Sequence, residues 1–165
     1  MVRKLERSIS MTIKATIVGA IASLILKRPA RKKTVAEFAA SLEEAGRAIA
    51  ARAAKAADTP GNREQLAHIA GIERWGQQRL RVFLGEAYVQ DEYDGYRPAA
   101  DLNYAQLQDF FRATRAETVQ LAQRIAAAKV PDAATVSHNF MGKLSARAWL
   151  RYLEMHANTE SKRIR

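Results

Sequence analysis

Histidine and carboxylate side chains are the groups in this sequence that could bind a metal ion. The chain has no cysteine, so thiolate metal sites, disulfides and a cysteine nucleophile are excluded within it. Its histidines are few, and they lie at His68, His138 and His156. A metal bound to this chain would therefore need histidine together with aspartate or glutamate as ligands.

His156 and Glu160 are four residues apart in a segment with helical spacing. Side chains at this spacing point from the same face of a helix, about 6 Å apart. Both lie on or beside an apolar stripe that contains Trp149 and Leu153, where an unpaired carboxylate would be costly to bury. Exposure near the helix end, an arginine partner or a metal would each remove this cost, and the spacing alone leaves all three open.

A second histidine and carboxylate occupy an earlier helical segment. His68 lies at the flank of its apolar face, where a metal ligand and a core histidine are equally compatible with the pattern. Glu73 falls inside that face. We expect it to form a structural salt bridge with an arginine of a neighbouring helix, such as Arg147 or Arg151.

The elements that must position these residues are helices, because apolar residues recur at steps of three and four. Thr34 and Glu37 form a capping-box pattern, while Gly85 and Pro131 end helical segments. The spacing predicts four helices, at about 34–57, 62–84, 102–130 and 145–165. No useful length of sequence alternates with a period of two, so no sheet is expected. Antiparallel packing in an all-α, up-and-down four-helix bundle follows from the short turn between the first two helices.

The positive charge of the chain is concentrated at its N-terminus. The formal net charge is +10, and residues 1–33 hold nine Lys or Arg and one acid, Glu6, which gives +8 for this segment. The remaining residues carry 18 basic and 16 acidic groups. A nucleic-acid-binding domain would more often carry a basic face on its body, so this distribution argues against that function. It also divides the chain into an extension, 1–33, and a helical domain, 34–165.

An apolar stretch from Ala15 to Leu26 lies inside this extension. As a helix it would rise about 18 Å, which is less than the roughly 30 Å hydrocarbon core of a bilayer. No clear small-residue cleavage site follows it, which argues against a signal peptide. We expect an amphipathic helix, docked on the bundle or on a partner, and the alternative is a peripheral membrane anchor assisted by the basic flank.

Two connections are long enough to have a function, residues 86–101 and 129–144. The first contains three tyrosines and five acids. It could act as a lid or substrate wall through polar groups at Tyr93, Asp94, Tyr96 and Arg97, or it could be an ordered surface loop. The sequence leaves both interpretations open.

Two stretches resemble the DinB/YfiT-like superfamily. Residues 66–75 (LAHIAGIERW) are similar to its second-helix signature, in which a histidine is followed five residues later by glutamate. Residues 138–156 (HNFMGKLSARAWLRYLEMH) are similar to the segment that leads through a glycine loop into its last helix. The resemblance covers roughly residues 34–165. It places His138 outside the ligand positions, where we expect it to bond to the loop backbone.

The resemblance implies a four-helix bundle in which one residue of the second helix and two of the last hold a divalent metal. Transferred to this sequence, the ligands are His68, His156 and Glu160. The commoner family pattern has histidine at the last of these positions. Two histidines and a glutamate suit zinc, nickel, iron or manganese. Glu73 could bond to the second ring nitrogen of a ligating histidine.

The function that this resemblance implies is a metal-dependent enzyme acting on a small molecule. The family's reaction types are thiol transfer, isomerisation and hydrolysis, and a low-molecular-weight thiol is a cofactor of some members. The alternative is a non-enzymatic bundle with a decayed metal site that associates with a partner or membrane surface through residues 1–33. We expect a cytoplasmic or membrane-peripheral protein, and the sequence leaves open whether it forms a homodimer.

Overall fold

The chain is mostly helical, and the computed structural model describes residues 23–165. The expectations for residues 1–22 lie outside the described residues. Four long helices dominate the structure: α3 (Val35–Lys55), α4 (Pro60–Val82), α5 (Tyr104–Ala127) and α6 (Ala146–Ser161). The shorter elements are η1 (Ser23–Lys27), α2 (Arg28–Ala30), η2 (Tyr93–Tyr96), β1 (Val136–His138) and β2 (Gly142–Leu144).

Side-chain caps fix where the long helices begin. The Thr34 capping box is present, with the Glu37 amide donating to the Thr34 hydroxyl and the Glu37 carboxylate accepting from the Thr34 amide. Thr59 caps α4, which starts at Pro60, slightly earlier than predicted, because proline is well accommodated at the first helical position. Asn103 and Ser145 cap α5 and α6 in the same way. The four predicted helices are therefore confirmed.

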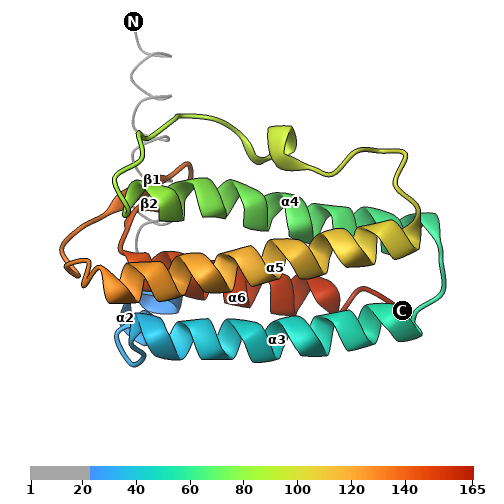
Figure 1. Ribbon diagram of the computed structural model, residues 1–165, viewed down its shortest axis with the longest axis horizontal. Helices are drawn as coiled ribbons and strands as arrows, with labels where there is room; N and C mark the ends of the chain where they lie inside the picture. Colours follow the sequence, from blue (N-terminus) through green and yellow to red (C-terminus); the bar gives the residue numbers. More distant parts are fainter. Residues whose placement is uncertain (1–22) are drawn as a thin grey trace, which may run out of the picture.

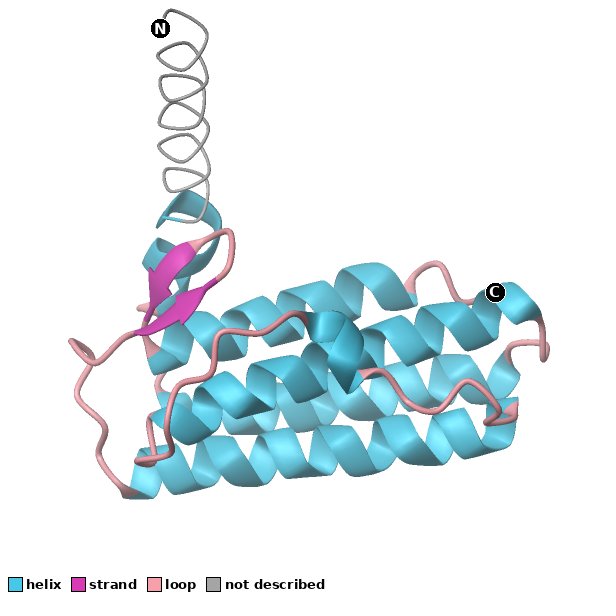
Figure 2. Cartoon of the chain, turned by 90° about the horizontal axis from the view of Figure 1, so that it is seen from above, coloured by secondary structure: helices cyan, strands magenta, loops and turns pink. Residues whose placement is uncertain are grey.

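The helices do not alternate simply in direction. Figure 1 shows α3 and α6 running one way along the body and α4 and α5 running the other way, with α5 and α6 each packed against both α3 and α4. The expectation that all sequential helices are antiparallel is therefore wrong for α4 and α5. The reason is the connection of residues 83–103, which returns along the length of the helices (Figures 1 and 2). An extended chain spans about 3.3 Å per residue and a helix rises only 1.5 Å, so this return is easily made.

The core is built from apolar residues of the four long helices, which recur at the steps of three and four that predicted these helices. Phe38, Leu42 and Ile49 of α3 are buried, and so are the inner residues of the other long helices, which include Leu66, Ile69, Leu80, Leu107, Phe111, Leu121, Ile125, Trp149 and Leu153. Ile164, just beyond α6, is buried too. The spacing of apolar residues thus identified the buried face of each long helix.

A small hairpin corrects the expectation that no sheet forms. β1 and β2 pair antiparallel, with Val136 opposite Leu144 and His138 opposite Gly142. Each strand has three residues, too few for a period of two to be recognised in the sequence. Gly142 has φ of +69°, which a glycine adopts without steric cost.

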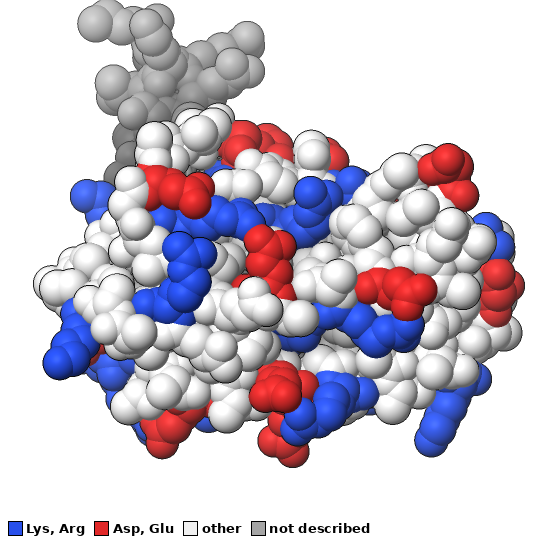
Figure 3. All heavy atoms as spheres, viewed as in Figure 1, with Lys and Arg blue, Asp and Glu red and all other residues white. Residues whose placement is uncertain are grey.

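The end of the N-terminal segment packs on the helices. Leu26 and Ala30 are buried in the main core, and the Arg151 side chain of α6 donates to the Ile25 carbonyl oxygen at 2.8 Å. Docking on the helical body is therefore observed for residues 23–30. Among the helices of residues 23–165, none combines the length and apolarity needed to cross a membrane. On the face of the molecule drawn in Figure 3, basic and acidic side chains are interspersed.

Candidate functional site

Two histidines predicted as metal ligands meet between α4 and α6. His68 of α4 and His156 of α6 are both half-buried, and the centres of their rings are 5.1 Å apart at an interplanar angle of 59°. They come together because α4 and α6 pack side by side along their length. The structure therefore brings together two of the three predicted ligands through residues 88 positions apart in the sequence.

The separation of the two ring centres leaves room for a shared cation. A metal–nitrogen bond of roughly 2.0–2.1 Å places the centre of an imidazole ring about 3.2 Å from the metal. Two rings bound at a near-tetrahedral angle then have their centres about 5 Å apart. The observed 5.1 Å between His68 and His156 agrees with this value.

Both imidazoles are in the protonation state that metal binding requires. Burial, together with the neighbouring His68, lowers the pKa of His156 to about 4. Burial also lowers the pKa of His68, and the nearby Glu160 carboxylate only partly opposes this effect. Both rings are therefore neutral at pH 7. Within residues 23–165 neither ring takes part in a hydrogen bond, so their nitrogen lone pairs are available to a ligand.

Glu160, the third predicted ligand, is held by other side chains. Its Oε2 accepts hydrogen bonds from Gln65 at 2.9 Å and from Arg163 at 2.7 Å. Of the three arrangements that the sequence left open for this carboxylate, the structure shows an arginine partner. Across the part of the chain that the structure describes, no group of three or more His, Asp or Glu side chains is arranged to hold a metal ion. Glu160 is close enough to oppose the lowering of both histidine pKa values, but within residues 23–165 it does not complete a three-residue metal group with them.

Tyrosines enclose the histidine pair. Tyr93 of η2 meets the His68 ring edge-on, with ring centres 5.8 Å apart. Tyr152, one turn before His156 on α6, lies 5.9 Å from the ring of that histidine. Burial raises the pKa of Tyr152 to about 12, so its hydroxyl stays protonated. The connection of residues 83–103 therefore places Tyr93 against the histidine pair, and its role as a lid or substrate wall stays a prediction.

An acidic residue of this connection, Asp91, fastens it to α4. Asp91 Oδ1 lies 2.5 Å from Arg79 Nη1 and accepts from the Trp75 indole nitrogen at 3.1 Å, and Oδ2 accepts from the Tyr96 hydroxyl. Burial raises the pKa of Asp91, but the hydrogen bonds from Tyr96 and Arg79 outweigh it and keep the pKa below its ordinary value.

The sequence did contain a signal for this contact. Arg79 follows Trp75 by four residues on the buried face of α4, and its side chain is only 1% exposed. A lone arginine at such a position must have a partner. The partner could not be named in advance, since the segment that contains Asp91 holds several acids.

Glu73 forms the expected structural salt bridge, but with a different arginine. Its carboxylate pairs with Arg115 of α5, at 2.7 Å from Nε and 2.8 Å from Nη2, and both side chains are almost fully buried. The predicted partners are engaged elsewhere, because Arg147 pairs with Asp132 and Arg151 donates to the Ile25 carbonyl. Both carboxylate oxygens of Glu73 thus face Arg115, and the proposed bond to a ligating histidine stays a prediction.

His138 has the role predicted for it. Its Nδ1 accepts the backbone amides of Phe140 and Met141, which closes the turn between β1 and β2. The ring is stacked on Trp149 and meets Trp75 edge-on. Burial lowers the pKa of His138 to about 4, so it is neutral and acts as a structural residue.

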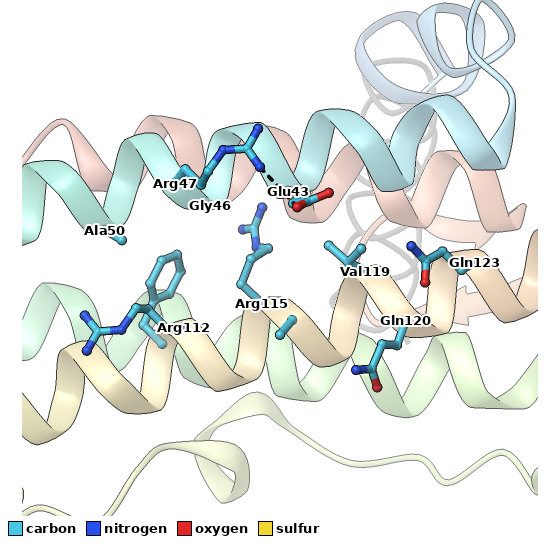
Figure 4. Close-up of a pocket in the computed structure, with 11 residues that line it drawn as sticks. Glu43, Gly46, Arg47, Ala50, Arg112, Arg115, Val119, Gln120 and Gln123 are labelled. Carbon is cyan, nitrogen blue, oxygen red and sulfur yellow. Dashed lines mark hydrogen bonds and ion pairs between the residues drawn. The ribbon is translucent and has the colours of Figure 1, made fainter.

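A surface groove of about 410 Å³ runs between α3 and α5, away from the histidine pair. Figure 4 shows Gly46 on α3 facing the aliphatic part of Arg115, with Arg47 and Glu43 paired at the rim. A Cβ at Gly46 would lie 2.6 Å from Arg115 Cγ, so this glycine allows the buried arginine to pass. The Arg115 guanidinium is already bound to Glu73 and to the Leu42 carbonyl, so its charge is compensated within the protein.

Comparisons with known proteins give no further support for a site in this chain. No family model matches the sequence, and searches of the curated proteins and of the solved structures find no match. Functional inference therefore depends on the residues of this chain.

Proposed function

We propose that the protein binds a divalent cation through His68 and His156 and uses it to act on a small-molecule substrate. The observation that carries this proposal is the histidine pair itself, whose ring centres are 5.1 Å apart. Both rings are neutral, and within the described residues both lack a hydrogen-bond partner. The two half-buried imidazoles do not form a hydrogen bond with each other. A shared cation would bind a nitrogen of each ring.

Glu160 is the third ligand in this proposal. It would exchange its bonds with Gln65 and Arg163 for the cation. The Arg163 side chain is 69% exposed, so the ion pair that would be lost is a surface one and contributes less than about 1 kcal/mol. Zinc, nickel, iron and manganese all accept two imidazoles and a carboxylate.

The fold and the reaction class are also part of the proposal. We infer that the four long helices form a bundle of the DinB/YfiT-like kind, supported by the motifs at 66–75 and 138–156 and by the position of the histidine pair between the second and last of these helices. A cation at this position supplies Lewis acidity, which lowers the pKa of a water or thiol and orients it for attack. Tyr93 and the connection that carries it would exclude bulk water from the substrate.

Metal analysis of the purified full-length protein tests the proposal, followed by isothermal titration with zinc. We expect one cation per chain in the wild type and none in His68→Ala or His156→Ala. Met155→Ala is the matched control, because it truncates the neighbouring side chain on α6 without removing a ligand. Equal zinc binding in the wild type and in His156→Ala would rule the proposal out.

One observation favours a second candidate, a non-enzymatic helical protein whose metal site has decayed. Glu160 is engaged by Gln65 and Arg163, and no three-ligand group is assembled in the described part of the chain. This candidate predicts no specific zinc binding in the wild type. It also predicts that Glu160→His, which restores the commoner family pattern, creates a site where none existed.

A further inference from the structure

A second cavity, of about 510 Å³, lies at the end of the molecule where the N-terminal segment meets α6. Segments far apart in the sequence form its walls: η1 and α2, the loop after α5, β2 and the first turn of α6. Basic side chains dominate its lining, namely Lys27, Arg31, Lys143 and Arg147. This cavity is separate from the histidine pair.

Within residues 23–165, the positive charge around this cavity is only partly neutralised. Asp132 is the acid in the lining, and it pairs with Arg147. Within residues 23–165, Lys27, Arg31 and Lys143 form no ion pair. Three uncompensated cations around one cavity repel one another, and a bound anion would remove that repulsion.

The polar groups at the cavity suit a phosphate. Lysine and arginine are the side chains that most often bind phosphate in proteins, arginine by paired hydrogen bonds and lysine as a point charge. The wall also includes Ser145, the cap of α6, and the N-terminus of this 16-residue helix carries the positive end of its dipole. The Thr135 hydroxyl in the lining is a further hydrogen-bond donor.

Exposed apolar side chains stand directly before the first of these cations. Leu24 and Ile25 of η1 are 62% and 44% exposed, and Lys27 follows in the same short helix. Leu26, which lies between this apolar pair and Lys27, is fully buried, so the backbone that carries the pair is fixed against α6. An exposed apolar pair on the same short helix as a lysine of a basic cavity is an arrangement that a phospholipid could contact with its acyl chains and its headgroup.

We propose that this cavity binds a phosphate group, presented by an anionic lipid headgroup or by a free phosphate compound. Lys27, Arg31 and Lys143 provide the charge, and the start of α6 provides the oriented dipole. The proposal does not depend on metal binding at His68 and His156, and the two can fail separately.

Binding of inorganic phosphate to the full-length protein, measured by isothermal titration, is the first test. A variant with Lys27→Gln, Arg31→Gln and Lys143→Gln removes three charges from the cavity. The matched control, with Lys55→Gln, Lys162→Gln and Arg165→Gln, removes three exposed charges at the opposite end of the helices (Figure 1). We expect the cavity variant to lose about tenfold or more in affinity, the effect of removing at least one charge-assisted hydrogen bond, and the control to bind as the wild type does.

Cosedimentation with vesicles of phosphatidylcholine and phosphatidic acid distinguishes the two sources of phosphate. If the source is lipid, Leu24→Ser with Ile25→Ser weakens vesicle binding while inorganic phosphate still binds. If the source is a free compound, these substitutions leave both measurements unchanged. Phosphate affinities that are equal in the cavity variant and its control, or no phosphate binding by the wild type, would overturn the proposal.

Discussion

The buried pair of Glu73 and Arg115 allows the sharpest stability prediction. Substitution Glu73→Gln keeps the shape of the side chain but removes the negative charge that faces Arg115, and both side chains are at most 5% exposed. Arg115 would then keep its bond to the Leu42 carbonyl at 3.1 Å and face an amide that offers one acceptor oxygen, and its charge would be uncompensated in the interior. Breaking a buried pair in this way costs about 3–5 kcal/mol, a large part of the roughly 5–15 kcal/mol by which a typical domain is stable.

Urea unfolding followed by circular dichroism measures this loss. Glu117→Gln is the control, since Glu117 pairs with Arg81 at the surface and its side chain is 47% exposed. We expect the control to change the free energy of unfolding by less than about 1 kcal/mol. The double variant Glu73→Leu with Arg115→Met replaces the pair by apolar side chains and should recover much of the stability that Glu73→Gln loses. A cost below about 1 kcal/mol for Glu73→Gln would refute this account of the pair.

Further predictions follow from other contacts. Gly76→Ala places a Cβ 2.5 Å from Leu153 and should destabilise the protein by about 1–3 kcal/mol in urea unfolding, whereas Gly95→Ala, with open space around it, should have little effect. Asp91→Ala removes the acceptor that fastens residues 83–103, so limited proteolysis should cut this connection faster than in the wild type, and an unchanged rate would contradict the role of Asp91. The folded-state pKa of His138 is depressed to about 4 from 6.5, so unfolded chains take up its proton first, and stability should fall as pH decreases from about 6.5 to 4. The free energy of unfolding, measured with urea across this pH range, should change less with pH in His138→Asn than in the wild type. An equal change with pH in both proteins would contradict the burial effect.

Local signals in the sequence predicted much of the fold. The capping box at Thr34 and the steps of three and four between apolar residues located the helices and their buried faces, because these signals depend only on neighbouring residues. The hairpin at 136–144 was missed, since strands of three residues leave no periodic trace. The parallel course of α4 and α5 was missed too, because helix direction depends on the path of the connection at 83–103.

The difference between local signals and helix arrangement also explains which parts of the site were predicted. His68 and His156 come together, as the family resemblance implied, because each lies at the edge of an apolar stripe and the two stripes pack on each other. The prediction of Arg147 or Arg151 as the partner of Glu73 was wrong, because the order of the helices decides which arginine lies opposite Glu73. With α5 running parallel beside α4, this residue is Arg115. The spacing left open which group would compensate the Glu160 carboxylate. In the structure this group is Arg163, three residues further along the chain.

The central claim is that His68 and His156 share a cation, and anomalous diffraction at the zinc edge tests it most directly. Crystals of the full-length protein grown with zinc should show an anomalous peak between the two rings, with a nitrogen of each about 2.0–2.1 Å from the metal. In the same map, Glu160 should have turned from Arg163 toward the metal. A well-ordered histidine pair with no anomalous peak between the rings, at zinc concentrations that saturate binding in solution, would contradict the account.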